Sequence, residues 1–141
     1  MRVAIYHRVK EDDFDQEASV KLLKLEMEQR VRREYPDAEI IGYYVDKGTG
    51  REAFQQMIKD AEAGKFDRIE TESVRKFVDD ARELLTLGTR LKKLARPVRI
   101  HFEFEGITTG TDEWEHGINF LMSFLESAYR NSGKKGARCR I

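Results

Sequence analysis

The chain contains little cysteine and proline and has no excess of either charge. Of its 141 residues, one is cysteine and two are proline. The single cysteine, Cys139, excludes an internal disulfide framework. Lys and Arg together number 26, as do Asp and Glu, so the formal net charge is zero. A protein that binds nucleic acid by overall charge needs a basic excess, so any such contact here must come from a local patch.

Long hydrophobic runs are also missing. The longest apolar stretch, residues 40–45, is interrupted by Gly42 and falls far short of the ~20 residues of a membrane-spanning helix. The first residues lead directly into a strand-like pattern, unlike a signal peptide. A chain of this length typically forms one domain and buries enough surface to fold without disulfides or metal. We therefore expect one globular domain in the cytoplasm, with no contact to a membrane.

Short apolar runs alternate with helical patterns along the chain. The four expected strands cover residues 3–6, 40–45, 66–71 and 98–104. The expected helices cover residues 19–35, 54–61 and 77–94, and a long C-terminal helix starts near Asp112. Ser19 is the expected N-cap of the first helix. Glu70 and Glu72 make the third strand a poor candidate for burial on both faces. This order predicts an α/β domain with a mostly parallel sheet of four to five strands flanked by helices.

The C-terminal helix has apolar side chains on two faces. Such a helix is buried completely, or it is buried by its own domain on one side and by a partner on the other. We expect a dimer interface there, formed by Phe120, Phe124, Leu125 and Ala128. Residues 1–130 would then form the domain, and residues 131–141 a flexible basic tail.

Cations gather where several expected strands end. Tyr6, Arg8 and Lys10 alternate at the end of the first strand. The carboxyl ends of parallel strands form the edge where open α/β sheets bind ligands. Arg51, Arg75 and Lys76 follow later strands and can reach the same edge, where several cations suit a phosphate group. Separate surface cations, each paired with a nearby acid, fit the spacing equally well.

Metal and nucleotide sites find no support in the sequence. The three histidines lie far apart, whereas zinc needs at least three converging donors. The segment Gly48-Thr49-Gly50 lacks the spacing of a phosphate-binding glycine loop and suits a turn that needs a positive φ. We expect no cofactor.

Several strings, in order, resemble the N-terminal catalytic domain of the serine recombinases, the resolvase/invertase family. Residues 4–13 resemble its opening Tyr-x-Arg-Val-Ser-Thr-Asp-Asp, and residues 44–50 its Val-Asp-x-Gly-x-Ser-Gly loop. Residues 51–57 resemble Arg-x-x-Phe-x-x-Met, and residues 105–109 resemble Glu-x-Ile-x-Thr before the long helix. The resemblance extends from Met1 to about Arg130, and it implies a three-layer resolvase-like, flavodoxin-like fold.

The resemblance also implies a function. In active members, a serine hydroxyl at the end of the first strand attacks a DNA phosphodiester, arginines surround the phosphate, and no metal or nucleotide is needed. The long helix serves as the dimer interface and helps to engage DNA, which places Arg130 among the expected DNA contacts together with Tyr6, Arg8, Arg51, Arg75 and Lys76.

The sequence departs from the family where the chemistry takes place. Lys10 stands at the position of the serine, and a lysine amine is a cation near neutral pH rather than a nucleophile. The Arg-x-x-Arg after the third strand falls on Lys76 and Asp79, although a one-residue slip would bring in Arg75. Arg8 and Arg51 are retained.

Three hypotheses follow. In the leading one, the domain has lost strand cleavage and acts by dimerising or by associating with DNA or with an active recombinase. In the second, it is an active phosphodiester-cleaving enzyme with an unusual nucleophile, or one that uses Lys10 as a general acid or electrostatic clamp. In the third, it is a phosphate or nucleotide sensor that uses the cationic strand edge.

Overall fold

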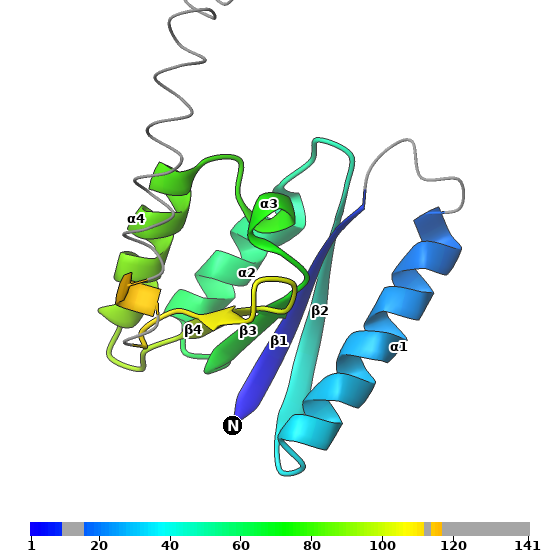
Figure 1. The fold of residues 1–141 in the computed structure, drawn as a ribbon, viewed down its shortest axis with the longest axis horizontal. Helices are drawn as coiled ribbons and strands as arrows, with labels where there is room; N and C mark the ends of the chain where they lie inside the picture. Colours follow the sequence, from blue (N-terminus) through cyan, green and yellow to red (C-terminus); the bar gives the residue numbers. More distant parts are fainter. Residues whose placement is uncertain (10–15, 112–113, 117–141) are drawn as a thin grey trace, which may run out of the picture.

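The computed structural model describes residues 1–9, 16–111 and 114–116. Its strands form one sheet in the order β2-β1-β3-β4-β5, parallel except for β5, which runs antiparallel to β4 (Figure 1). The strands are β1 (Arg2–Val9), β2 (Glu39–Lys47), β3 (Arg68–Thr71), β4 (Arg99–Phe102) and β5 (Ile107–Thr108). The helices are α1 (Gln16–Glu34), α2 (Glu52–Glu62), α3 (Val74–Phe77) and α4 (Ala81–Lys92).

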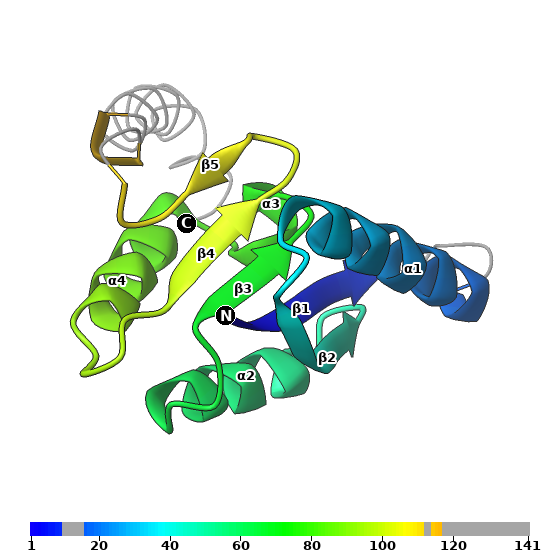
Figure 2. The same ribbon diagram turned by 90° about the horizontal axis from the view of Figure 1, so that it is seen from below.

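Helices lie on both faces of the sheet. α1 covers one face over β1 and β2, while α2 and α4 lie on the opposite face (Figure 2). Helical connections between parallel strands place the helices on the faces in this way. The arrangement confirms the predicted three-layer α/β fold. The C-terminal helix expected from Asp112 lies outside the described residues except for residues 114–116.

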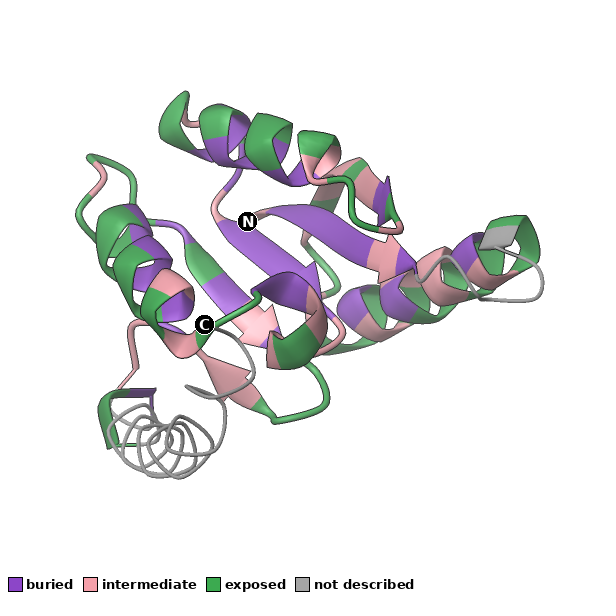
Figure 3. Cartoon of the chain, turned by 90° about the horizontal axis from the view of Figure 1, so that it is seen from above, coloured by how far each residue is buried: buried purple, intermediate pink, exposed green. Residues whose placement is uncertain are grey.

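Aromatic rings close the sheet face toward α2, α3 and α4. The ring of Phe77 lies 5.0 Å from that of Phe54 and 5.5 Å from that of Phe102, measured between centroids. Tyr6 lies 5.6 Å from Phe77, also edge-on. Edge-to-face pairs bring the positive rim of one ring to the negative face of the next. All four side chains are buried, and this face holds the larger of the two clusters of buried residues. Figure 3 shows that the central strands of the sheet are mostly buried.

The opposite face is apolar only beneath α1. Val3 and Ile5 of β1 pack there against Met27 and Val31 of α1. Because side chains alternate along a strand, His7 lies on this same face, where it is buried.

Beside this apolar patch, the same face carries a buried ion cluster. Glu70 of β3 is 0% exposed. Its carboxylate accepts hydrogen bonds from Arg30 Nη2 of α1 at 2.9 Å and from Arg68 Nε of β3 at 2.7 Å. The prediction that Glu70 and Glu72 disfavour burial of β3 on both faces is therefore wrong, because two arginines neutralise Glu70 and allow every residue of β3 to be buried.

The helix expected at residues 77–94 is two helices. α3 ends at Phe77, Val78 is extended, and α4 begins after Asp80, whose carboxylate accepts the Glu83 N–H at 2.8 Å. The first helix also differs, since it begins at Gln16 and holds Ser19 in its interior. Ser19 is therefore not an N-cap.

Glycines end two elements as the sequence indicates. Gly48 follows β2 with φ 62°, and Gly64 follows α2 with φ 76°. These are left-handed conformations, which glycine adopts without the Cβ clash of other residues.

The strand expected to reach Phe104 ends at Phe102 instead, and Phe104 lies in the following turn with 85% of its surface exposed.

Candidate functional site at the carboxyl ends of the strands

Arg8 marks the site at the end of β1. Its side chain points to the same sheet face as Tyr6, since the two residues are two apart in a strand. Its Nη1 lies 3.0 Å from Oδ1 of Asp79, a residue of the turn between α3 and α4. Arg8 is 18% exposed and Asp79 67% exposed, so solvent reaches this ion pair mainly from the side of Asp79.

Arg51 stands immediately before α2 and is held on three sides. Its guanidinium carbon lies 3.9 Å from the centroid of the Phe54 ring, a cation–π contact. Its Nη2 donates to the carbonyl of Phe77 at 2.7 Å and to Oε1 of Glu83 at 3.3 Å. Its Nη1 is buried and has no hydrogen-bond partner in residues 1–9, 16–111 and 114–116.

Asp46 fixes the loop that carries Arg51. Its carboxylate accepts the backbone N–H groups of Ala53 at 2.9 Å and Phe54 at 3.0 Å, which are free donors in the first turn of α2. The Tyr6 hydroxyl donates to the same carboxylate at 2.7 Å. Burial, and then the bond to Asp46, raise the pKa of Tyr6 well above its ordinary value.

Tyr6 therefore belongs to the core in this structure. Its side chain is 0% exposed and its hydroxyl is used by Asp46, an arrangement that does not fit the predicted contact between Tyr6 and a phosphate.

Lys76 and Arg75 lie on α3. The Lys76 ammonium is 2.9 Å from Oε2 of Glu72, and Ser73 caps the helix by accepting the Lys76 N–H. Arg75 is exposed, and it makes no ion pair or hydrogen bond in the part of the chain that the structure describes.

The structure thus places Arg8, Arg51, Lys76 and Asp79 at one end of the sheet. Each of the three cations contacts a carboxylate: Asp79, Glu83 and Glu72 respectively. Sequence reasoning named Asp79 but missed Asp46, Glu72 and Glu83, because opposite charges at these spacings are common on any surface. The remaining predicted residues lie outside the described part of the chain: Lys10, Arg130, Phe120, Phe124, Leu125 and Ala128.

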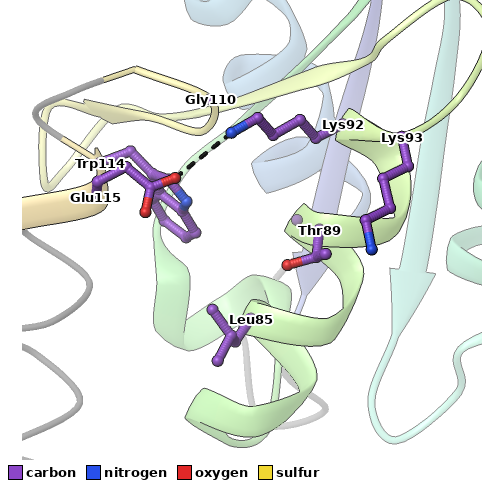
Figure 4. Close-up of a pocket in the computed structure, with 8 residues that line it drawn as sticks. Leu85, Thr89, Lys92, Lys93, Gly110, Trp114 and Glu115 are labelled. Atoms are coloured by element: carbon purple, nitrogen blue, oxygen red, sulfur yellow. Dashed lines mark ion pairs between the residues drawn. The ribbon is translucent and has the colours of Figure 1, made fainter.

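The described residues offer no metal site. Within residues 1–9, 16–111 and 114–116, no group of three His, Cys, Asp or Glu is placed to hold a metal ion. A pocket of about 390 Å³ lies beside α4, where Lys92 and Glu115 face each other across 3.5 Å (Figure 4). It shares no residue with the strand-end site.

No described helix is long and apolar enough to cross a membrane.

The fold matches solved structures over nearly its whole length. A resolvase family site-specific recombinase from Streptococcus pneumoniae shares 21% identity and a TM-score of 0.75, with 99% of this chain and 97% of that one covered. For the N-terminal catalytic domain of TP901-1 integrase, the identity is 20%, the TM-score is 0.63, and the coverages are 92% and 98%. The C-terminal catalytic domain of ISC1926 TnpA, an IS607-like serine recombinase, has 16% identity, a TM-score of 0.56, and coverages of 95% and 84%.

A family model describes the sequence itself. The model for the resolvase N-terminal domain matches residues 3–138. The chain therefore belongs to the resolvase family of serine recombinases, in its N-terminal catalytic-type domain. No curated protein matches the chain.

Proposed function

We propose that this domain no longer cleaves DNA and acts in the cytoplasm by association with DNA, with a second copy of itself or with an active recombinase. The observation that carries the proposal is the pairing of its cations. Arg8, Arg51 and Lys76 stand at positions that hold the scissile phosphate in active members, and each contacts an internal carboxylate. Phosphoryl transfer needs positive charge directed at the transition-state oxygens, whereas these cations are directed at carboxylates.

The residue at the nucleophile position supports the same proposal. Lys10 replaces the serine there, and its ammonium carries no lone pair with which to attack a phosphodiester near neutral pH. Asp79 adds a negative charge where active members have a guanidinium. Strand transfer thus lacks both its nucleophile and part of its charge stabilisation.

Incubation with supercoiled plasmid DNA tests the loss of cleavage. We expect neither nicked circles nor a covalent protein–DNA adduct, at any protein concentration and with or without Mg²⁺. Lys10→Ser alone should also remain inactive, because Asp79 and Glu83 still pair with the two arginines. A phosphorylated side chain trapped on the wild-type protein would overturn the proposal.

The association is tested by sedimentation. The apolar residues Phe120 and Phe124 motivate a contact along the C-terminal segment, and Phe124→Asp should weaken it because the contact would have to bury a charge. Phe104→Asp is the matched control, since Phe104 is 85% exposed in the domain and lies in a different segment. A strict monomer at high concentration, both alone and mixed with a recombinase, would contradict this part of the proposal.

A further inference from the structure

Two carboxylates four residues apart in the chain, those of Asp79 and Glu83, contact both retained arginines. Asp79 belongs to the turn between α3 and α4, and Glu83 belongs to the first turn of α4. They reach arginines of two other elements, Arg8 at the end of β1 and Arg51 before α2, at 3.0 Å and 3.3 Å. We call Asp79 and Glu83 the acidic pair.

The two members of the acidic pair are coupled. Oε1 of Glu83 faces Arg51, while its Oε2 accepts the backbone N–H of Asp79 at 3.2 Å. A displacement of Glu83 therefore removes a bond that fixes the turn bearing Asp79. The two contacts form one unit that can open together.

The contact with Glu83 leaves Arg51 incompletely satisfied. Nη1 of Arg51 is buried and finds no hydrogen-bond partner among the described residues. A guanidinium can donate in a fork to two oxygens of a carboxylate or a phosphate, and Glu83 uses only one such donor. A phosphate group that displaced Glu83 would bring further acceptor oxygens to the same guanidinium.

Exposure is divided unequally between the partners. Asp79 and Glu83 are 67% and 37% exposed, whereas Arg8 and Arg51 are 18% and 16% exposed. The acids can therefore turn into solvent while packing keeps the arginines in place. Ion pairs with an exposed member contribute little to stability, so displacing the acids costs the fold little.

We propose that the acidic pair is an autoinhibitory latch that competes with DNA phosphodiesters for Arg8 and Arg51. The proposal rests on the proposed function, because it takes these arginines as the groups that meet DNA. It adds that the domain keeps the capacity to bind DNA through these arginines, although it has lost cleavage. This capacity becomes available when the acidic pair moves away.

The test compares two double variants of the full chain that make the same change in charge. Asp79→Asn with Glu83→Gln removes the latch. Glu26→Gln with Asp37→Asn is the control, since both residues are exposed and their side chains make no ion pair or hydrogen bond among the described residues. Affinity for a fluorescent 30-base-pair duplex is measured by anisotropy over a series of salt concentrations.

We expect the latch variant to bind the duplex more tightly than wild type by on the order of tenfold, with a steeper salt dependence. The control should gain less than about twofold. Adding Arg8→Gln to the latch variant should abolish the gain. Asp79→Asn alone, at the more exposed position, should give part of the gain and serves if the double variant folds poorly.

Equal gains in the latch and control variants would overturn the proposal, because the effect would then be one of net charge. A folded Asp79→Asn variant that binds the duplex no more tightly than wild type would also overturn it. The same holds if inorganic phosphate raises the thermal stability of the latch variant while that variant binds the duplex no more tightly. The plasmid cleavage assay is independent of these outcomes: cleavage by the wild type refutes the proposed function, whereas unchanged binding refutes only the latch.

Discussion

The two faces of the sheet are built from the same strands but are stabilised in different ways. On one face, β1 presents Tyr6 to a cluster of aromatic rings. On the other, it presents His7, and the neighbouring β3 presents Glu70 to two arginines. Alternation along the strands separates the two environments by a single residue.

The comparison shows how differently the two faces respond to change. The aromatic face depends on buried area and close packing, which a truncation reduces in proportion to the cavity it leaves. On the opposite face, which we call the charged face, the ion cluster of Arg30, Arg68 and Glu70 depends on matched partners. Removal of one charge leaves another without compensation, although removal of the whole cluster can cost nothing.

Truncation at the centre of the aromatic face should have the largest effect. Phe77 is fully buried, and its ring contacts those of Tyr6, Phe54 and Phe102. Phe77→Ala is expected to lower the free energy of unfolding by about 4 kcal/mol, through lost burial and the resulting cavity. Urea denaturation followed by circular dichroism measures the loss. A change below about 1 kcal/mol would show that the ring cluster contributes little.

Loss of the buried acid should rank next. Glu70→Gln leaves Arg30 and Arg68 without their shared carboxylate and is expected to cost about 3 kcal/mol in the same assay. The combined variant Arg30→Met, Arg68→Met, Glu70→Leu should recover stability to near the wild-type value or above it, because no buried charge remains. If the combined variant is less stable than Glu70→Gln, the ion cluster itself is stabilising. The contrast drawn between the two faces of the sheet is then wrong.

Lowering the pH should reduce the free energy of unfolding through His7, which is buried on the charged face. Burial lowers the pKa of His7 to about 4, with smaller effects of Glu72, which raises it, and of Lys24 and Lys76, which lower it. Between pH 6.5 and 4 the unfolded chain binds a proton at this residue and the folded chain does not, so stability falls as the pH is lowered. The loss should be about 3 kcal/mol.

Urea denaturation at a series of pH values measures this slope. His7→Phe should remove much of it, because the folded and unfolded states then bind the same number of protons at this position. His116→Gln is the control, because His116 is exposed. An unchanged slope in His7→Phe would assign the acid sensitivity to other groups.

The smallest effect concerns the hydrogen bond that the Tyr6 hydroxyl of the aromatic face donates to Asp46. Tyr6→Phe removes the hydrogen bond from the hydroxyl to Asp46 but leaves the ring and the two N–H groups that Asp46 accepts. The expected cost is about 1 kcal/mol. Thermal unfolding of the variant beside the wild type resolves it, and a cost near that of Phe77→Ala would mean that Asp46 depends on Tyr6 to hold α2.

The positions of most strands and helices could be predicted because neighbouring residues specify them. Apolar alternation in β4, the helical spacing of α2 and the glycine after each of two elements depend only on neighbouring residues. Prediction failed at residue 78, where neither proline nor glycine marks the break. α3 ends there because Phe77 enters the aromatic cluster and Asp80 caps a new helix.

The candidate site could be predicted only in part. The resemblance to the family pointed to Arg8 and Arg51, and the structure brings both to the strand ends, but the spacing left open whether the cations were free or paired. Asp79 lies 71 residues from Arg8, and Glu83 lies 32 from Arg51. No local pattern encodes such pairs, so their partners could not be read from the chain.

By itself, the sequence determined the order of most strands and helices and the membership of the family, because these are properties of residue type and spacing. Only the tertiary structure decided that Glu70 is buried and neutralised and that the arginines of the strand edge already contact carboxylates. The physical reason is that the Coulomb energy of a charge depends on which other charges lie within a few ångströms, and folding alone brings distant residues that close.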